Sequence, residues 1–156
     1  MSTFVLDTGM VLGYIRAAGF AEYAEKHFSV STPPNIAIVS VVTIGEIYSL
    51  SVQFGWGSEK QKKLKEVLSK IPVVNINHPE ILERYAKIDA FSQGKNPSKR
   101  LPGGTTSRNM GKNDVWIAAT CSVLKGILLT TDHDYDHLNG VFLKLEYIDQ
   151  KLKGAD

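Results

Sequence analysis

The sequence predicts a three-layer α/β/α fold around a central, mostly parallel sheet, and two observations support this. Short apolar runs with the length of buried strands alternate with segments whose apolar residues recur at helical spacing. Such alternation is typical of parallel strands joined by helical crossovers. The chain has 156 residues, 43% of them hydrophobic, which suits one domain over residues 1–156 and excludes an intrinsically disordered protein.

The first 93 residues contain three strand-like runs and five segments with helical spacing. The strands are expected at residues 4–6, 36–39 and 73–76. The helices are expected at residues 11–15, 20–28, 43–54, 58–70 and 79–93. Thr43 and Glu46 have the spacing of a capping box, which predicts that the third helix begins at Thr43.

Residues 94–112 have a different composition from the rest of the chain. Glycine, proline and small polar residues dominate this segment, and from Ala90 to Asn113 there are five basic residues and no acidic one. It is predicted to be a long basic loop, and loops of this length in compact domains are usually functional or disordered. Asn113 is then expected to cap a helix to Lys125, with strands at 127–130 and 141–148.

Composition excludes several other classes of protein. The formal net charge is only +2, so the basic loop leaves the remainder of the chain slightly negative. The single cysteine, Cys121, excludes an intrachain disulfide or a thiolate zinc site, and its apolar neighbours predict a core position. No apolar run reaches the ~18 residues of a membrane helix, and the amino-terminal residues do not resemble a signal peptide, so a cytoplasmic protein is expected.

Four acidic residues occupy positions that suggest a shared site. Asp7 and Asp132 follow apolar strand-like runs, Asp114 opens a predicted helix, and Glu46 lies in the first turn of another. In open α/β sheets, the site lies beyond the carboxyl ends of the strands, so these acids are expected to meet at one edge. Clustered carboxylates favour a hard divalent ion such as Mg²⁺ or Mn²⁺, which lowers the pKa of a bound water and neutralises phosphate charge.

Each acid also has a purely structural explanation. Glu46 could be the capping partner of Thr43, and Asp114 could favour the positive end of its helix. Asp7 and Asp132 could be turn residues. Residue spacing alone leaves both interpretations open.

Local motifs suggest three other kinds of site. Asp7-Thr8-Gly9 matches the signature of aspartic proteases, which need two such aspartates, so only a dimer of this chain would satisfy it. His133 and His137 are four residues apart and suggest zinc, but no third ligand is evident, so solvated histidines are expected. The acidic run that begins at Asp132 lacks the glycine and glutamate of a calcium-binding loop.

Four stretches resemble the PIN (PilT N-terminus) domain family, particularly the VapC-type toxin ribonucleases of type II toxin–antitoxin pairs. The stretches are residues 4–8 (FVLDT), 40–47 (SVVTIGEI), 113–119 (NDVWIAA) and 128–135 (LLTTDHDY). The last two are the most specific, because an aspartate opens an Ile-Ala-Ala helix and a strand then leads into Thr-x-Asp-x-Asp-aromatic. Two departures are Leu50, where many such toxins have glycine, and the long loop at 94–112.

The resemblance implies a Mg²⁺- or Mn²⁺-dependent endoribonuclease, with a small antitoxin and a homodimer as expected partners. It implies an acidic pocket around the metal that is formed by Asp7, Glu46, Asp114 and Asp132. The polar residues expected to support this pocket are Thr130, Asp134 and Asn113. The basic residues expected to contact RNA phosphates are Lys99, Arg100, Arg108 and Lys112. The alternatives are an RNA-processing PIN nuclease that is not a toxin, and a PIN module that binds RNA or protein without cutting.

Overall fold

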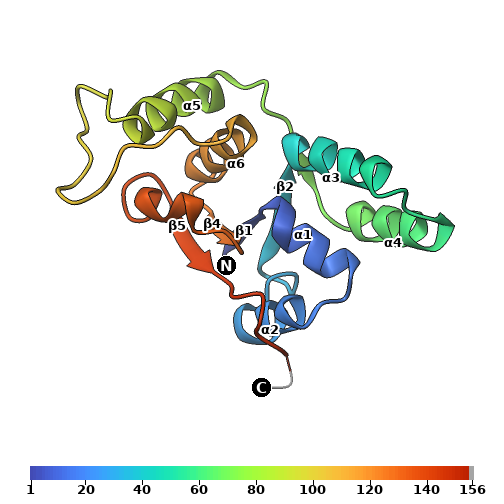
Figure 1. The fold of residues 1–156 in the computed structure, drawn as a ribbon. Coiled ribbons are helices and arrows are strands. Elements are labelled where there is room, and N and C mark those ends of the chain that lie inside the picture. The colour runs from blue at the N-terminus through green and yellow to red at the C-terminus, as the bar shows by residue number, and fades with distance from the viewer. Residues whose placement is uncertain (155–156) are drawn as a thin grey trace.

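A five-stranded parallel sheet forms the centre of the molecule (Figure 1). The computed structural model describes residues 1–154, so residues 155–156 of the predicted domain lie outside the described residues. The strands are β1 (Thr3–Leu6), β2 (Ile36–Ser40), β3 (Val73–Val74), β4 (Ile127–Thr130) and β5 (Lys144–Tyr147). Their spatial order is β3-β2-β1-β4-β5, and every neighbouring pair is parallel, as the sequence predicted.

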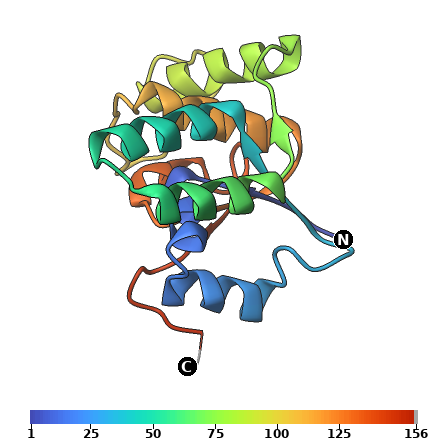
Figure 2. The ribbon, with the colours of Figure 1, turned by 90° about the vertical axis from the view of Figure 1, so that its right-hand side faces the viewer.

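Helices cover both faces of this sheet. They are α1 (Thr8–Ile15), α2 (Gly19–Phe28), α3 (Val41–Gln53), α4 (Ser58–Ser69), α5 (Pro79–Ser92), α6 (Lys112–Val123) and the 3₁₀ helix η1 (His133–Leu138). Figures 1 and 2 agree that α2 lies on the opposite side of the sheet from α5 and α6. The predicted three-layer α/β/α architecture is therefore confirmed.

Alternation along the central strands produces two separate cores. Val5 and Leu128 belong to the core formed with α5, α6 and η1. Phe4, Leu6 and Leu129 belong to the core formed with α1 to α4. Successive side chains of a strand point to opposite faces, so each central strand supplies apolar residues to both layers. Cys121 is fully buried in the first core, as predicted.

Strand order determines where the polar residues meet. β1 is central and pairs with β4 in a register that places Leu6 opposite Leu129. Because the strands are parallel, the residues that follow both strands leave the sheet at the same edge. Asp7 and Thr130 therefore come together although 123 positions separate them in the chain.

Two helix caps predicted from the sequence are wrong. α3 begins at Val41, directly after β2, and its cap is Ser40, whose hydroxyl accepts a hydrogen bond from the Val42 N–H at 3.2 Å. Thr43 is buried inside the helix, so it forms no capping box with Glu46. α6 begins at Lys112 after Gly111, so Asn113 is a first-turn residue and not its cap.

The weakest strand predictions were too long. β3 has only two residues, because Asn75 accepts a hydrogen bond from the Asn77 N–H and turns the chain away from the sheet. β5 begins at Lys144, because residues 138–143 form hydrogen-bonded turns after η1. Both edge strands pair on one side only, so little opposes these turns.

The predicted basic loop is a real feature of the fold. Residues 94–111 contain no helix or strand, and the segment extends from the end of α5 before it returns to α6 (Figure 1). Met110 is buried and Leu101 packs against the core, so the middle and the end of the loop are anchored. Among the described residues, no helix combines the length and apolar character needed to cross a bilayer.

Candidate active site

Asp7 is the most buried acid of the candidate site. It ends β1 and caps α1, where its Oδ1 accepts a hydrogen bond from the Met10 N–H at 2.8 Å. Its Oδ2 accepts a hydrogen bond from the Thr130 hydroxyl. Burial, at 5% exposure, raises the pKa of Asp7 to about 6, and the carboxylates of Asp114 and Asp132 add to the rise, while the two hydrogen bonds oppose it.

Thr130 connects the buried acid to the exposed ones. Its side chain is fully buried at the end of β4, beside Asp7. While its hydroxyl donates to Asp7, its oxygen accepts a hydrogen bond from the Asp132 N–H at 2.9 Å. One side chain thus sets the position of Asp7 relative to the backbone that carries Asp132.

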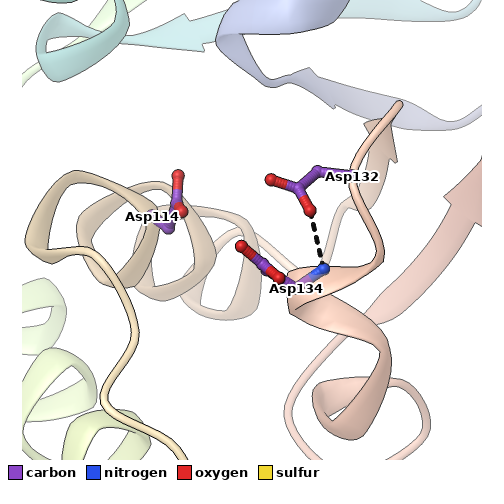
Figure 3. A group of neighbouring side chains, drawn as sticks. All are labelled: Asp114, Asp132 and Asp134. Carbon is purple, nitrogen blue, oxygen red and sulfur yellow. Dashed lines mark hydrogen bonds between the residues drawn. The ribbon is translucent and has the colours of Figure 1, made fainter.

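Three further carboxylates form a cluster above this pair. Asp114, Asp132 and Asp134 each present an oxygen to the group, and these atoms lie within 4.8 Å of one another. Figure 3 shows the three side chains directed toward a common space between α6 and η1. Asp132 also caps η1, since its Oδ1 accepts a hydrogen bond from the Asp134 N–H at 2.8 Å.

Asp114 is held by a tyrosine. The Tyr135 hydroxyl donates to Asp114 Oδ1 at 2.9 Å, and burial together with the nearby Asp114 raises the pKa of the tyrosine well above its ordinary value. Tyr135 therefore stays protonated and remains a donor at any physiological pH. Partial burial raises the pKa of Asp114, and Glu46, Asp132 and Asp134 raise it further.

Glu46 lies at the side of the cluster. It projects from α3, and its Oε1 accepts a hydrogen bond from the Thr8 hydroxyl at 2.7 Å. Its charge adds to the rise in the pKa of Asp114. Glu46 and Asn113 line one open groove of about 460 Å³, together with Leu50. The capping explanation of Glu46 is therefore wrong, and its side chain belongs to the site.

The four basic residues predicted to contact RNA have different surroundings, and Lys112 is the first residue of α6 rather than part of the loop. Lys112 Nζ lies 3.7 Å from Asp89 Oδ1, and Lys99 Nζ lies 4.7 Å from the centre of the Phe142 ring. Arg108 is half-buried, and its charge adds to the effect of burial in lowering the pKa of His137. Arg100 is exposed.

The two histidines do not share a site. Nδ1 of His133 lies 2.9 Å from Asp136 Oδ2, and its ring stacks on Tyr147. His137 instead lies 2.7 Å from the Ser92 hydroxyl through Nε2 and is half-buried. The expectation of a solvated residue is thus wrong for His137, because it packs between α5 and the loop.

Three residues of the site were not selected from the sequence as site residues. Thr8 binds Glu46, Tyr135 binds Asp114, and Gly9 provides space, because a Cβ at Gly9 would lie 2.5 Å from the Thr131 hydroxyl oxygen. All three belong to motifs already noted, as neighbours of Asp7 or as the aromatic residue after Asp134. The sequence shows that these residues belong to the motifs, but their contacts within the site depend on the fold.

The donor set fits a hard divalent cation. Every ligand in the cluster is a carboxylate oxygen, the type that Mg²⁺ and Mn²⁺ prefer. Burial and mutual repulsion raise the pKa values of Asp7 and Asp114, and a cation would relieve that repulsion. Asp114, Asp132 and Asp134 could hold such an ion directly, with Asp7 and Glu46 on either side.

The fold is also found in solved toxin–antitoxin complexes. VapBC2 from Rickettsia felis bound to a promoter DNA fragment is similar with a TM-score of 0.74 and 17% identity, over 94% of this chain and 99% of that chain. VapBC-1 from nontypeable Haemophilus influenzae has a TM-score of 0.64 and 19% identity, over 93% and 97%. VapBC-5 from Mycobacterium tuberculosis has a TM-score of 0.58 and 18% identity, over 95% and 98%.

These identities are low enough that the solved structures establish the fold alone. None of the curated proteins matches this chain. The family model described as PIN domain matches residues 4–141, which contain most of β1, all of β2 to β4 and η1, and every acidic residue of the site. Asp-Thr-Gly at the start of α1 is part of this architecture, so the aspartic-protease alternative is wrong. With its parallel sheet and the acids at its carboxyl edge, the chain belongs to the PIN domain family.

Proposed function

We propose that this protein is a Mg²⁺- or Mn²⁺-dependent endoribonuclease that hydrolyses RNA phosphodiester bonds. The observation that carries the proposal is the convergence of five carboxylates from four separate segments of the chain on one edge of the sheet. A protein that only binds RNA has no reason to concentrate negative charge where a phosphate must approach. The non-catalytic alternative therefore has less support.

Each acid has a separate role in this proposal. Asp114, Asp132 and Asp134 would hold the cation. Asp7 would contribute a further negative charge, and its carboxylate is positioned by hydrogen bonds from Thr130 and Met10. Glu46 would be a further ligand or would orient the attacking water, with Thr8 fixing its carboxylate. When bound, the cation would neutralise phosphate charge and lower the pKa of water.

The loop would supply phosphate contacts outside the acidic cluster. Arg100 is the exposed candidate, while Lys99 and Lys112 would exchange their present contacts with Phe142 and Asp89 for RNA phosphates. Arg108 lies near the end of the loop that leads into α6 and its Asp114. Cations at this position would hold a polyanion against an otherwise negative surface.

A toxin role with an antitoxin partner is the cellular function we propose. The support is the family together with the similarity in fold to VapBC complexes from three bacteria. Expression of the chain alone should arrest bacterial growth, and co-expression of a protein from the neighbouring gene should restore it. Cleavage without growth arrest would instead support an RNA-processing nuclease.

A homodimer is proposed from one face of α3. Tyr48 and Val52 share this face with Val41 and are 52% and 80% exposed, and Phe54 follows at 66%. Glu46 is the only charged residue of the helix, and it belongs to the site. An uncharged apolar face suits contact with its own copy, because a twofold contact brings like charges together. Val52→Glu should convert a dimer to a monomer in light scattering.

The decisive experiment compares cleavage of single-stranded RNA by wild type, Asp7→Asn and Asp114→Asn. Cleavage should require Mg²⁺ or Mn²⁺, stop with EDTA and be lost in both variants. Glu59→Gln is the matched control, because Glu59 is an exposed acid on α4. Unchanged cleavage by Asp7→Asn and Asp114→Asn would remove the acidic cluster from the mechanism.

A further inference from the structure

An aromatic pair lies exposed at the same edge of the sheet as the acids. The rings of His133 and Tyr147 stack with centroids 3.8 Å apart and an angle of 17° between their planes. The His133 side chain is 66% exposed, and Tyr147 is 38% exposed. A stacked pair of this kind on the surface contributes little to either core, since neither residue belongs to one.

The position of the pair is set by the site residues. His133 follows Asp132 directly and precedes Asp134, so it lies between two members of the acidic cluster. Tyr147 ends the edge strand β5 in register with Thr130, the residue that connects Asp7 to Asp132. Consecutive Cα atoms are only ~3.8 Å apart, so the backbone places His133 directly beside the acidic cluster.

The orientation of the His133 ring is also fixed. Nδ1 of His133 lies 2.9 Å from Oδ2 of Asp136, one turn later in η1. With one ring face against Tyr147 and one nitrogen held by Asp136, the ring is pre-organised. A flat group that stacks on such a ring does not lose binding free energy to immobilising the side chain.

The molecule contains a second pair of the same chemistry for comparison. Tyr23 and His27 stack with centroids 3.9 Å apart, but they are four residues apart on α2 and so meet through helical spacing alone. The loop after α2 leads into the amino end of β2, at the sheet edge away from the acids. The His133–Tyr147 pair instead joins two elements beside the site.

We propose that His133 and Tyr147 form a platform on which an unpaired nucleobase next to the cleaved phosphodiester stacks. This proposal rests on the proposed ribonuclease function and specifies its substrate as single-stranded RNA at the cleavage point. Aromatic rings accept any base, because every base has a π face. The platform therefore favours unpaired over duplex RNA and does not read a particular sequence.

Binding tests the platform without requiring cleavage. The probe is a 12-nucleotide single-stranded RNA with 2-aminopurine at successive positions, and the readout is fluorescence quenching on addition of protein. At one position, quenching should be strong with wild type and His133→Phe and weak with His133→Ala. Loss of a base–aromatic stack should weaken binding roughly 5- to 150-fold. His27→Ala, which removes the matched pair on α2, should bind as wild type.

Cleavage of an abasic RNA provides the second readout. Removing the base beside the mapped cleavage point should raise KM for wild type, and should have no further effect on His133→Ala. Tyr147→Ala should lose the abasic penalty as His133→Ala does, and Tyr147→Phe, which keeps an aromatic ring, should keep that penalty. Equal abasic penalties in wild type and His133→Ala would overturn the platform, as would unchanged quenching in His133→Ala. Quenching that depends on His133 without metal-dependent cleavage would keep the platform and remove the ribonuclease function.

Discussion

The acidic cluster and the basic loop differ in how sequence position relates to spatial position. The acids come from residues 7, 46, 114, 132 and 134, yet the fold brings them to one sheet edge against their mutual repulsion. The basic residues lie within 95–112, yet Lys112 approaches Asp89, Lys99 lies over Phe142 and Arg100 is exposed. Proximity in sequence is therefore a poor guide to proximity in space.

The reason for the difference is the sheet. Parallel strands in register deliver the residues that follow them to one edge, and helices that start there add first-turn residues such as Asp114. The loop has no such register, so each of its side chains finds its own contact. The comparison predicts that each acid of the cluster is essential to RNA cleavage. Each basic residue of the loop is expected to make only a small and independent contribution to RNA binding and cleavage.

The largest expected effect is loss of an acid from the cluster. Asp132→Asn should lower the RNA cleavage rate roughly 10²–10³-fold, the cost of removing one preorganised charged group from a catalytic site. Arg100→Ala should lower it only a few-fold. Single-turnover rates for both variants, at saturating Mg²⁺, measure the comparison. Equal losses in the two variants would contradict the distinction between cluster and loop.

The second prediction concerns pH and stability without metal. Burial raises the pKa of Asp7 from 3.8 to about 6, so between these values the folded protein binds more protons than the unfolded chain. The free energy of unfolding should therefore decrease as pH rises from about 4 to about 6, by ~3 kcal/mol from Asp7. Denaturant unfolding at a series of pH values in EDTA measures this decrease.

Asp7→Asn is the control for that experiment. It removes the titrating group, so the decrease between pH 4 and 6 should become smaller. The metal-free variant should also be more stable than wild type at pH 7, although it no longer cleaves RNA. A pH profile identical to that of wild type would show that Asp7 is not the titrating group.

The third prediction concerns Thr130, which connects the buried Asp7 to the exposed Asp132. Thr130→Val removes the hydroxyl that donates to Asp7 and accepts from the Asp132 N–H. It should lower the free energy of unfolding by about 1–3 kcal/mol at pH 7 and reduce cleavage, because a buried carboxylate loses a donor. The measurements are denaturant unfolding and the cleavage rate.

Thr120→Val is the matched control for the effect of removing a buried threonine hydroxyl in Thr130→Val. Thr120 is equally buried, but its hydroxyl donates only to the Trp116 carbonyl of its own helix, at 2.9 Å. Its replacement should change neither cleavage nor stability by much. A loss of cleavage in Thr120→Val as large as in Thr130→Val would indicate a general packing effect.

The smallest expected effects belong to the loop. Arg100→Ala should reduce the slope of log affinity for single-stranded RNA against log salt by about 0.7, the value for one phosphate contact. Lys112→Ala should change the slope less, because Asp89 already lies 3.7 Å from its ammonium group. Binding titrations from low to high KCl measure both slopes. A larger change with Lys112→Ala would mean that RNA displaces Asp89.

The overall fold was the most predictable part of the molecule. The strands at the centre of the sheet are short apolar runs between helices, and that pattern is sufficient for a parallel three-layer architecture. The edge strands were predicted too long, because side-chain turns at Asn75 and the turns after η1 compete with a single row of hydrogen bonds. Helix starts failed where Ser40 and Gly111 preceded the polar residues chosen as caps.

The sequence alone determined the family, the order of the layers and the acids that follow the strands, because periodicity and motif position are local properties. Tertiary structure decided the rest of the site. It brought Asp134 into the cluster, placed Thr130 between Asp7 and Asp132, and turned Tyr135 toward Asp114. It also stacked His133 on Tyr147 and dispersed the basic loop. These contacts join segments that are distant in the chain, so only strand register and packing could create them.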